Sequence, residues 1–306
     1  MKYLRLIRFK NLLMLAMMQL VFHFGYLKQQ DIVLALSDWQ FVLLVLATAC
    51  IAAGGYVINN VLDVATDMDN KPGDVVVGQG ISEGAAYNLY FALTVTGVAA
   101  GFYLSNQIER PNFAMAFVVV AATLYMYANS FKRYLIVGNV VIALLLAVSV
   151  LIVGIFDLVP AIPFNDRSLV ATIFGILVDY AIFTFFINLI REIVKDLEDV
   201  NGDYNQGMNT LPIALGVERT AKIASVLGVI AFAGLGWYMF KYLFNLIYVV
   251  LYGLIFLISP LAFFAINIWS ARKQKDFSAM SLVLKIVIFF GILSIAAITL
   301  NMKLHA

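Results

Sequence analysis

Apolar stretches recur along the whole chain, and short polar segments separate them. Each stretch holds about 20 residues, long enough for a helix to cross the hydrocarbon core of a bilayer. The pattern predicts an all-α membrane protein with nine transmembrane helices, because a bilayer leaves backbone polar groups no partners outside the helix. No intervening segment is long or polar enough for a soluble domain, so residues 1–306 are expected to form a single polytopic membrane domain. The predicted spans are 10–28, 39–63, 84–105, 111–131, 135–157, 168–195, 218–241, 246–271 and 279–302.

Composition narrows the chemistry. Of the 306 residues, 63% are hydrophobic and 12% are charged, whereas soluble domains carry about 25% charged residues. Cys50 is the only cysteine, so no internal disulfide can form. With His23 and His305 as the only histidines, a histidine-based zinc, iron or haem site is not expected. We expect His23 to be a packed residue of the first span and not a catalytic one. The net charge of +2 gives no reason to expect a nucleic-acid partner, and we expect none.

The basic residues predict the orientation of the chain. One side of the predicted spans has Lys or Arg at positions 2, 5, 8, 10, 71, 132, 133, 191, 195, 219, 222, 272, 273 and 275. The other side has them at 28, 110, 167, 241 and 303, while Lys285 falls inside the last span. Cytoplasmic loops carry the excess of Lys and Arg. The N-terminus and the polar ends of spans two and six are therefore predicted to face the cytoplasm.

The first polar cluster follows span two, with the spacing Asn59-x3-Asp63-x3-Asp67. Positions four residues apart lie on one face of a helix, so these side chains form a single stripe if the segment is helical. Carboxylate oxygens are ligands for hard cations such as Mg²⁺. The cluster is therefore a candidate for cation binding.

The second cluster follows span six and mixes both signs of charge. Its charged members are Arg191, Glu192, Lys195, Asp196, Asp199 and Asp203. Several carboxylates at a membrane boundary need positive partners, and Mg²⁺ ions bound to a diphosphate would balance them. The interleaved guanidinium and ammonium fit this prediction because both can bind phosphate oxygens. Charges at helix ends are often only solvated anchors, and Lys132 fits either role, but two such clusters on one side favour a site.

These segments resemble the UbiA superfamily of intramembrane prenyltransferases. The family's first signature is similar to Asn59-Asn60-Val61-Leu62-Asp63-Val64-Ala65-Thr66-Asp67 with Asn70-Lys71-Pro72 in this chain. Its second signature is similar to Arg191-Glu192-Ile193-Val194-Lys195-Asp196-Leu197-Glu198-Asp199 with Gly202-Asp203. Arg8-x2-Asn11 resembles the opening of the family, and Tyr127-x4-Lys132-Arg133 with Gly138-Asn139 resembles the link between its fourth and fifth helices.

The resemblance implies nine helices around a central cavity, with the active site at the cytoplasmic side. It implies Mg²⁺ as cofactor and an isoprenyl diphosphate donor, in a multi-pass protein of a prokaryotic cell membrane. The implied metal ligands are Asp63, Asp67, Asp196, Asp199 and Asp203. The implied catalytic residues are Asp63, Asp67, Asp196, Asp199, Arg191 and Lys195. The implied substrate-binding residues are Asn59, Lys71, Lys132, Asn139, Arg8 and Asn11.

The sequence departs from the family pattern in the first signature. Asn60 stands where the family usually has Asp, and Leu62 replaces an aromatic residue. Asp74 stands where many relatives place an Arg that contacts the diphosphate. The basic contact from this loop then depends on Lys71.

The lipophilic acceptor is predicted from the end of the first signature. Asn70-Lys71-Pro72 resembles the glycerolipid, chlorophyll and homogentisate branches, and the expected acceptor is geranylgeranylglycerol phosphate. An aromatic quinone precursor of the 4-hydroxybenzoate or dihydroxynaphthoate type is the alternative. A cation transporter is the alternative from another class, but transporters bind ions near the midplane rather than at helix ends. Donor chain length and oligomeric state do not follow from the sequence.

Asp179 lies within span six, where a carboxylate is costly and is a functional candidate by default. Lys285 is the obvious partner by charge. At 1.5 Å per helical residue the two differ in depth by about 15 Å, so we expect Asp179 to hydrogen-bond elsewhere in the bundle.

Overall fold

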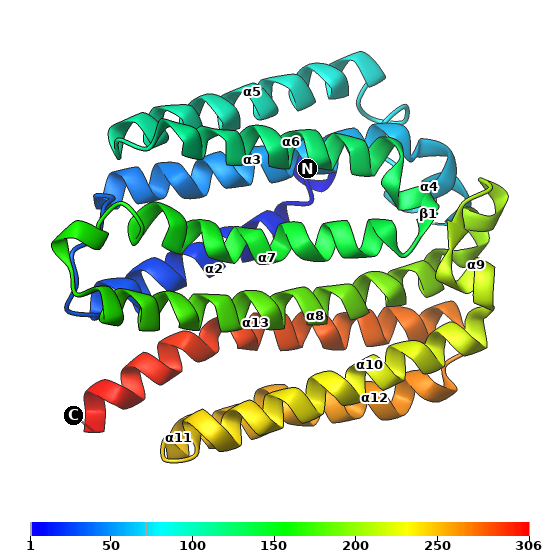
Figure 1. The fold of residues 1–306 in the computed structure, drawn as a ribbon. Helices are drawn as coiled ribbons and strands as arrows, with labels where there is room; N and C mark the ends of the chain where they lie inside the picture. The colour runs from blue at the N-terminus through cyan, green and yellow to red at the C-terminus, as the bar shows by residue number, and fades with distance from the viewer. Residues whose placement is uncertain (1, 71, 306) are drawn as a thin grey trace.

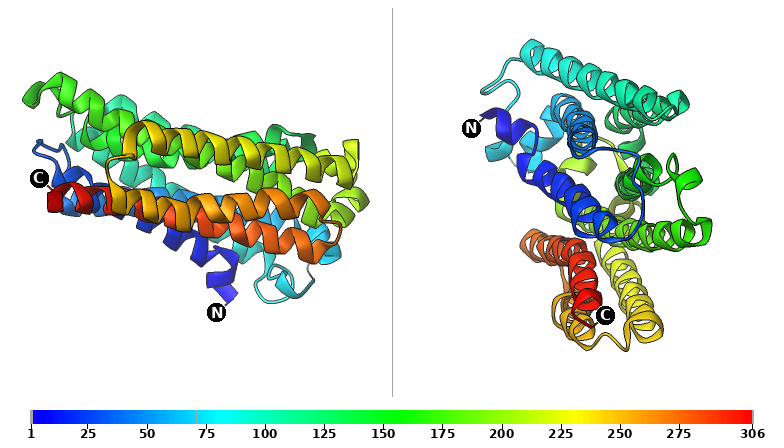
Figure 2. Two further views of the ribbon diagram at one scale, coloured as in Figure 1. Left: turned by 90° about the horizontal axis from the view of Figure 1, so that it is seen from below. Right: turned by 90° about the vertical axis from the view of Figure 1, so that its left-hand side faces the viewer.

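The computed structural model describes residues 2–70 and 72–305. Its long helices run roughly along one axis (Figures 1 and 2). The α-helices are α1 (Lys2–Leu6), α2 (Phe9–Gly25), α3 (Asp38–Leu62), α4 (Val64–Asn70), α5 (Glu83–Gln107), α6 (Ala114–Asn129), α7 (Val137–Asp157), α8 (Arg167–Asn205), α9 (Leu211–Leu215), α10 (Val217–Tyr238), α11 (Ile247–Gly253), α12 (Ser259–Ser270) and α13 (Gln274–His305). Two short strands are β1 (Tyr134–Leu135) and β2 (Asn209–Thr210).

Eight helices in the described part of the chain are long and apolar enough to cross a membrane. They are Asp38–Leu62, Glu83–Gln107, Pro111–Asn129, Val137–Asp157, Arg167–Asn205, Val217–Leu243, Ile247–Ser270 and Gln274–Asn301. The first predicted span, 10–28, corresponds to α2, which at 17 residues is shorter and is not one of the eight.

Polar caps set where several of these helices begin. Ser37 and Gln40 form a capping box at the start of α3. The Ser82 hydroxyl accepts a hydrogen bond from the Ala85 amide at the start of α5. The Asp166 carboxylate accepts from the Ser168 and Leu169 amides at the start of α8. Each cap satisfies backbone N–H groups that the first helical turn leaves unpaired.

The helices pack around two large apolar cores. One contains Phe22, Phe41 and Phe117, from α2, α3 and α6. The other contains Phe264 and Leu284, from α12 and α13. The first half of α8 contributes to the first core and the second half to the second core, and α13 likewise joins both. α8 and α13 therefore hold the two groups of helices together.

The largest difference from the predicted elements concerns α8. We expected span six to end at 195 and residues 196–217 to form a connection, but the helix continues without a break to Asn205. The physical reason is packing, because Val194 and Leu197 are buried in the second core. That burial extends the helix into a segment whose composition is polar. Asp196, Asp199 and Asp203 are therefore helical.

The connections gather at the two ends of the bundle. α4, β1 and α9 lie together at one end, on the right in Figure 1. There β1 pairs in parallel with β2, with Tyr134 opposite Asn209 and Leu135 opposite Thr210. This pairing fixes the turn after α6 beside the segment that follows α8.

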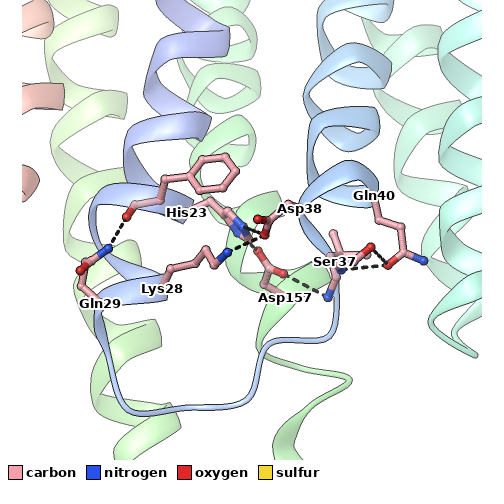
Figure 3. A network of polar contacts seen from close by, with 9 residues as sticks. His23, Lys28, Gln29, Ser37, Asp38, Gln40 and Asp157 are labelled. Atoms are coloured by element: carbon pink, nitrogen blue, oxygen red, sulfur yellow. Dashed lines mark hydrogen bonds and ion pairs between the residues drawn. The ribbon is translucent and has the colours of Figure 1, made fainter.

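A buried polar network closes the opposite end (Figure 3). His23 Nδ1 lies 2.7 Å from Asp157 Oδ2, and both side chains have no exposed surface. The Leu36 amide donates to Asp157 Oδ1 at 3.3 Å, and the His23 ring stacks on Phe41 with centroids 3.7 Å apart. Lys28 donates to Asp38 at 2.6 Å beside them. The prediction that His23 packs inside the bundle is confirmed.

Candidate active site

The two acidic segments lie side by side at the end of the bundle that carries β1 and β2. Asn70 Oδ1 accepts a hydrogen bond from the Gly202 amide at 2.8 Å, so α4 rests directly on α8. Asp69 Oδ2 accepts from Asn205 Nδ2 at 3.3 Å. A Cβ atom at Gly202 would lie 2.4 Å from Asn70 Nδ2. A side chain at position 202 would therefore displace the Asn70 amide from this contact.

The predicted single stripe of Asn59, Asp63 and Asp67 is interrupted. α3 ends at Leu62 with Asp63 as its C-cap, and a separate helix, α4, begins at Val64. The Asp63 amide still donates to the Asn59 carbonyl at 2.9 Å. Asp67 therefore lies on a helix of its own beside α8, because the chain turns at Asp63.

Lys132 forms an ion pair with Asp63, although 69 residues separate them in the sequence. Both side chains are largely buried, with 9% and 13% of their surface exposed. Lys132 belongs to the 3₁₀ turn Phe131–Arg133, which lies against the start of α7. A Cβ atom at Gly138 would be 2.8 Å from the Lys132 Cα, so this glycine allows the turn to sit where Lys132 reaches the carboxylate.

Asn139 links α7 to the second cluster. Its Nδ2 donates to Asp196 Oδ2 at 2.8 Å, and only 6% of Asn139 is exposed. The amide oxygen of Asn59 is buried and has no hydrogen-bond partner in the structure. A buried acceptor of this kind is costly unless a ligand satisfies it.

The carboxylates of this end act on one another. Burial and then the negative charge of Asp63 raise the pKa of Asp67 to about 6, with Asp199 adding to the effect. Asp203 is also buried, with 8% of its surface exposed. The mutual repulsion among these carboxylates favours the binding of a cation. In the described ranges 2–70 and 72–305, no three of these side chains enclose a metal position by themselves. Oxygen ligands that leave room for water and phosphate are nevertheless what Mg²⁺ prefers.

The cations of α8 share one carboxylate. Lys195 Nζ donates to both oxygens of Glu192 at 2.9 and 3.0 Å, and Arg191 Nη1 approaches it at 3.5 Å. Glu192 is 7% exposed. The sequence places Glu192 in the second cluster but predicts no metal-binding, catalytic or substrate-binding role for it. Glu192 follows Arg191 by one residue and precedes Lys195 by three on a helix. This spacing of opposite charges is the pattern that could have identified Glu192.

A cavity of about 240 Å³ lies among α2, α3, α6, α7, α8 and α13. Its polar lining includes Arg8, Asn11, Asn59, Asn188, Arg191, Glu192, Lys195 and Lys285. Its apolar lining includes Met14, Met18, Phe117, Val120, Leu124, Ile142 and Ile288. None of the predicted metal ligands, Asp63, Asp67, Asp196, Asp199 and Asp203, lines it.

Two further predicted residues lie in this cavity. The Arg8 guanidinium stands 5.4 Å from the centre of the Tyr56 ring. Asn11 Oδ1 accepts a hydrogen bond from Lys285 Nζ at 3.0 Å. Lys71 lies outside the described residues. The site thus has two halves, an acidic one at the junction of α4 and α8 and a basic one that faces the cavity.

Comparison with known proteins identifies the family. The sequence model of the UbiA prenyltransferase family matches residues 20–297. The chain belongs to the UbiA prenyltransferase family. It is therefore a multi-pass integral membrane prenyltransferase, and the predicted family and enzyme class are confirmed.

Individual relatives agree with this. The digeranylgeranylglyceryl phosphate synthase of Saccharolobus solfataricus is 32% identical over 292 residues, which cover 94% of this chain and 95% of the relative. The enzyme of the same name from Sulfurisphaera tokodaii is 32% identical, with 72% and 74% covered.

Solved structures show the same fold. One from a study of digeranylgeranylglyceryl phosphate synthase in membranes has a TM-score of 0.61 at 24% identity and covers 97% of this chain and 96% of that one. A UbiA homologue from Archaeoglobus fulgidus, bound to GPP and Mg²⁺, has a TM-score of 0.59 at 19% identity and covers 96% and 99%. At these identities the likeness concerns the fold alone.

The structure explains one departure of this UbiA family member. Asn60 Nδ2 donates to the Leu6 carbonyl at 3.1 Å and to the Tyr56 carbonyl at 2.7 Å. A carboxylate at this position could not donate either hydrogen bond. Asn60 therefore ties α1 to α3. The side chain of Asp74 lies outside the described part of the structure.

The expectation for Asp179 is confirmed. Its Oδ2 accepts a hydrogen bond from the Tyr238 hydroxyl at 3.0 Å, within the bundle. Lys285 instead donates to Asn11, at the polar end of the cavity.

Proposed function

We propose that this prenyltransferase transfers a prenyl group from an isoprenyl diphosphate to the free hydroxyl of geranylgeranylglyceryl phosphate, in a Mg²⁺-dependent reaction. The observation that carries the proposal is the site itself, with paired acidic segments beside a cavity that is basic at one end and apolar at the other. The acceptor is taken from the relatives at 32% identity, which are digeranylgeranylglyceryl phosphate synthases.

The acidic half would hold the metal. Its ligands in this proposal are Asp63, Asp67, Asp196, Asp199 and Asp203. Bound Mg²⁺ supplies Lewis-acid chemistry, which draws negative charge from the leaving diphosphate. Asn139 orients the Asp196 carboxylate by its hydrogen bond.

The basic residues stabilise the leaving group. Arg191 and Lys195 lie on the cavity face of α8, and Lys132 lies at Asp63. Fixed cations of this kind lower the barrier because they oppose charge that grows as the bond breaks. The remaining proposed substrate-binding residues are Asn59, Lys71, Asn139, Arg8 and Asn11.

The apolar end of the cavity accommodates the prenyl chain. Tyr56, Tyr127 and Phe117 line this cavity, and their ring faces can shield a developing allylic cation. The bond between the first prenyl carbon and the diphosphate oxygen breaks, and the acceptor hydroxyl oxygen forms an ether bond to that carbon. The hydroxyl proton leaves to water, and pyrophosphate is released.

The membrane arrangement follows the basic residues. α2 supplies the ninth crossing, and residues 1–306 form one domain around the cavity. The N-terminus and the acidic end face the cytoplasm of a prokaryotic cell, where soluble diphosphates and Mg²⁺ are available.

In the decisive experiment, the purified protein is incubated with labelled geranylgeranyl diphosphate and Mg²⁺. Three acceptors are supplied in parallel reactions: geranylgeranylglyceryl phosphate, 4-hydroxybenzoate and dihydroxynaphthoate. We expect a labelled ether from the glycerolipid phosphate alone, and none after EDTA is added. Product from an aromatic acid alone would overturn the proposed acceptor. No product from any acceptor in the presence of Mg²⁺ would overturn the proposed function.

A further inference from the structure

Lys285 places an ammonium group inside the cavity without a carboxylate partner. It lies on α13, and its Nζ donates to Asn11 Oδ1 on α2 at 3.0 Å. The cations Arg191 and Lys195 line the same cavity. Within residues 2–70 and 72–305, the structure gives Lys285 no ion pair.

The polar end of the cavity has an excess of positive charge. Arg8, Arg191, Lys195 and Lys285 line it, and Glu192 is the carboxylate among them, which leaves three positive charges uncompensated there. Like charges at membrane depth repel and lose hydration, so this arrangement is stabilised when an anion binds. The Arg191 Nε is moreover a buried donor with no hydrogen-bond partner in the structure.

We propose that Lys285, Asn11 and Arg8 form a binding site for the phosphate monoester of the acceptor, next to the diphosphate-binding residues Arg191 and Lys195. This inference rests on the proposed function and names the residues that recognise its acceptor. A phosphate dianion suits the site because it has oxygens for a forked guanidinium and for an ammonium.

The position of Lys285 distinguishes the acceptor phosphate from the donor diphosphate. In the proposed function, the donor diphosphate binds between the acidic half and the α8 cations Arg191 and Lys195, with Lys132 at Asp63 on the acidic side. Lys285 instead lies on α13 and donates a hydrogen bond to Asn11 on α2. The two anionic substrates can then bind at the same time. Positive charge faces the donor diphosphate at one site and the acceptor phosphate at the other.

The test compares Lys285→Gln with the wild-type protein and with Lys275→Gln, a matched change at an exposed position of the same helix. KM is measured separately for geranylgeranylglyceryl phosphate and for the diphosphate donor. We expect Lys285→Gln to raise the acceptor KM by about tenfold or more, because a hydrogen bond to a charged group is lost. The donor KM should stay within about twofold, and Lys285→Arg should retain most of the acceptor affinity.

A second measurement isolates the phosphate. Glycerol 1-phosphate, which lacks the prenyl chain, is used as a competitive inhibitor against the acceptor. Its inhibition constant should rise in Lys285→Gln and not in Lys275→Gln. If Lys285→Gln does not fold, Asn11→Ala, which removes the group that positions the ammonium, should raise the same constant.

The possible failures are distinct. An active wild-type enzyme with an unchanged acceptor KM in Lys285→Gln, or with a raised donor KM instead, overturns the phosphate site and leaves the proposed function standing. A wild-type enzyme that makes no product from the glycerolipid phosphate overturns the proposed function itself.

Discussion

The amide of Asn139 donates a hydrogen bond to the carboxylate of Asp196 across the interface between α7 and α8, with Nδ2 and Oδ2 2.8 Å apart. This bond holds one oxygen of a proposed metal ligand in a fixed orientation. Mutation of a group that orients a metal ligand typically costs about 10–100-fold in metal affinity or activity.

Changing this amide should weaken Mg²⁺ activation. Asn139→Asp places a second negative charge against Asp196, and we expect the Mg²⁺ concentration for half-maximal activity to rise about tenfold. Titrating activity with Mg²⁺ measures it. Asn106→Asp, an exposed asparagine on α5, serves as the control. An unchanged Mg²⁺ requirement in Asn139→Asp would remove Asn139 from the site.

Gly138 and Gly175 form a matched pair for the position of Lys132. A methyl group at Gly138 would meet the Lys132 Cα at 2.8 Å, whereas at Gly175 nothing lies within 4 Å. Gly138→Ala must shift the turn and move the ammonium away from Asp63. We expect kcat/KM for the donor to fall about tenfold or more, since charge stabilisation depends on exact placement. Gly175→Ala should be as active as the wild type. Equal activity of both variants would mean that the turn can move without consequence.

Restoring the usual family residue at position 60 should harm the protein. Asn60→Asp loses the bonds to the Leu6 and Tyr56 carbonyls. A buried acceptor left unsatisfied costs about 1–3 kcal/mol, so the apparent Tm should fall. Asn106→Asp loses only the local bond to Phe102 within its own helix and should fall less. Limited proteolysis should also cut residues 1–8 faster in Asn60→Asp. Equal proteolysis of the wild type and the variant would argue against a role in anchoring α1.

The pair of His23 and Asp157 should contribute to stability and not to catalysis. Asp157→Ala leaves the His23 ring and the Leu36 amide without their acceptor. We expect the free energy of unfolding to fall by about 1–3 kcal/mol, while the KM values for both substrates stay unchanged. Thermal unfolding in detergent measures this, with Asp31→Ala, an exposed position in the connection between α2 and α3, as the control. A change in KM would imply that this end of the bundle is coupled to the site.

Hydropathy and spacing predicted most of the helices and the residues of both acidic segments. They failed where packing overrode composition, as at Leu197, whose burial carries α8 through a polar stretch. They also could not predict that the chain turns at Asp63 and separates Asp67 from α3. The pairings of Lys132 with Asp63 and of Lys285 with Asn11 join residues 69 and 274 positions apart, and no local pattern specifies such partners.

The contact between Lys285 and Asn11 bears on how the protein is made. It joins the second helix to the last one, so the basic end of the cavity is complete only after α13 has entered the membrane. The contacts of the acidic end join residues no later than Thr210, but the core that buries Val194 and Leu197 and extends α8 past 195 also needs α12 and α13. Because synthesis runs from the N-terminus at about 5–20 residues per second, several seconds separate the synthesis of β2 from that of the last helix. Both ends of the site are therefore complete only after the C-terminal helix has packed against α2 and α8.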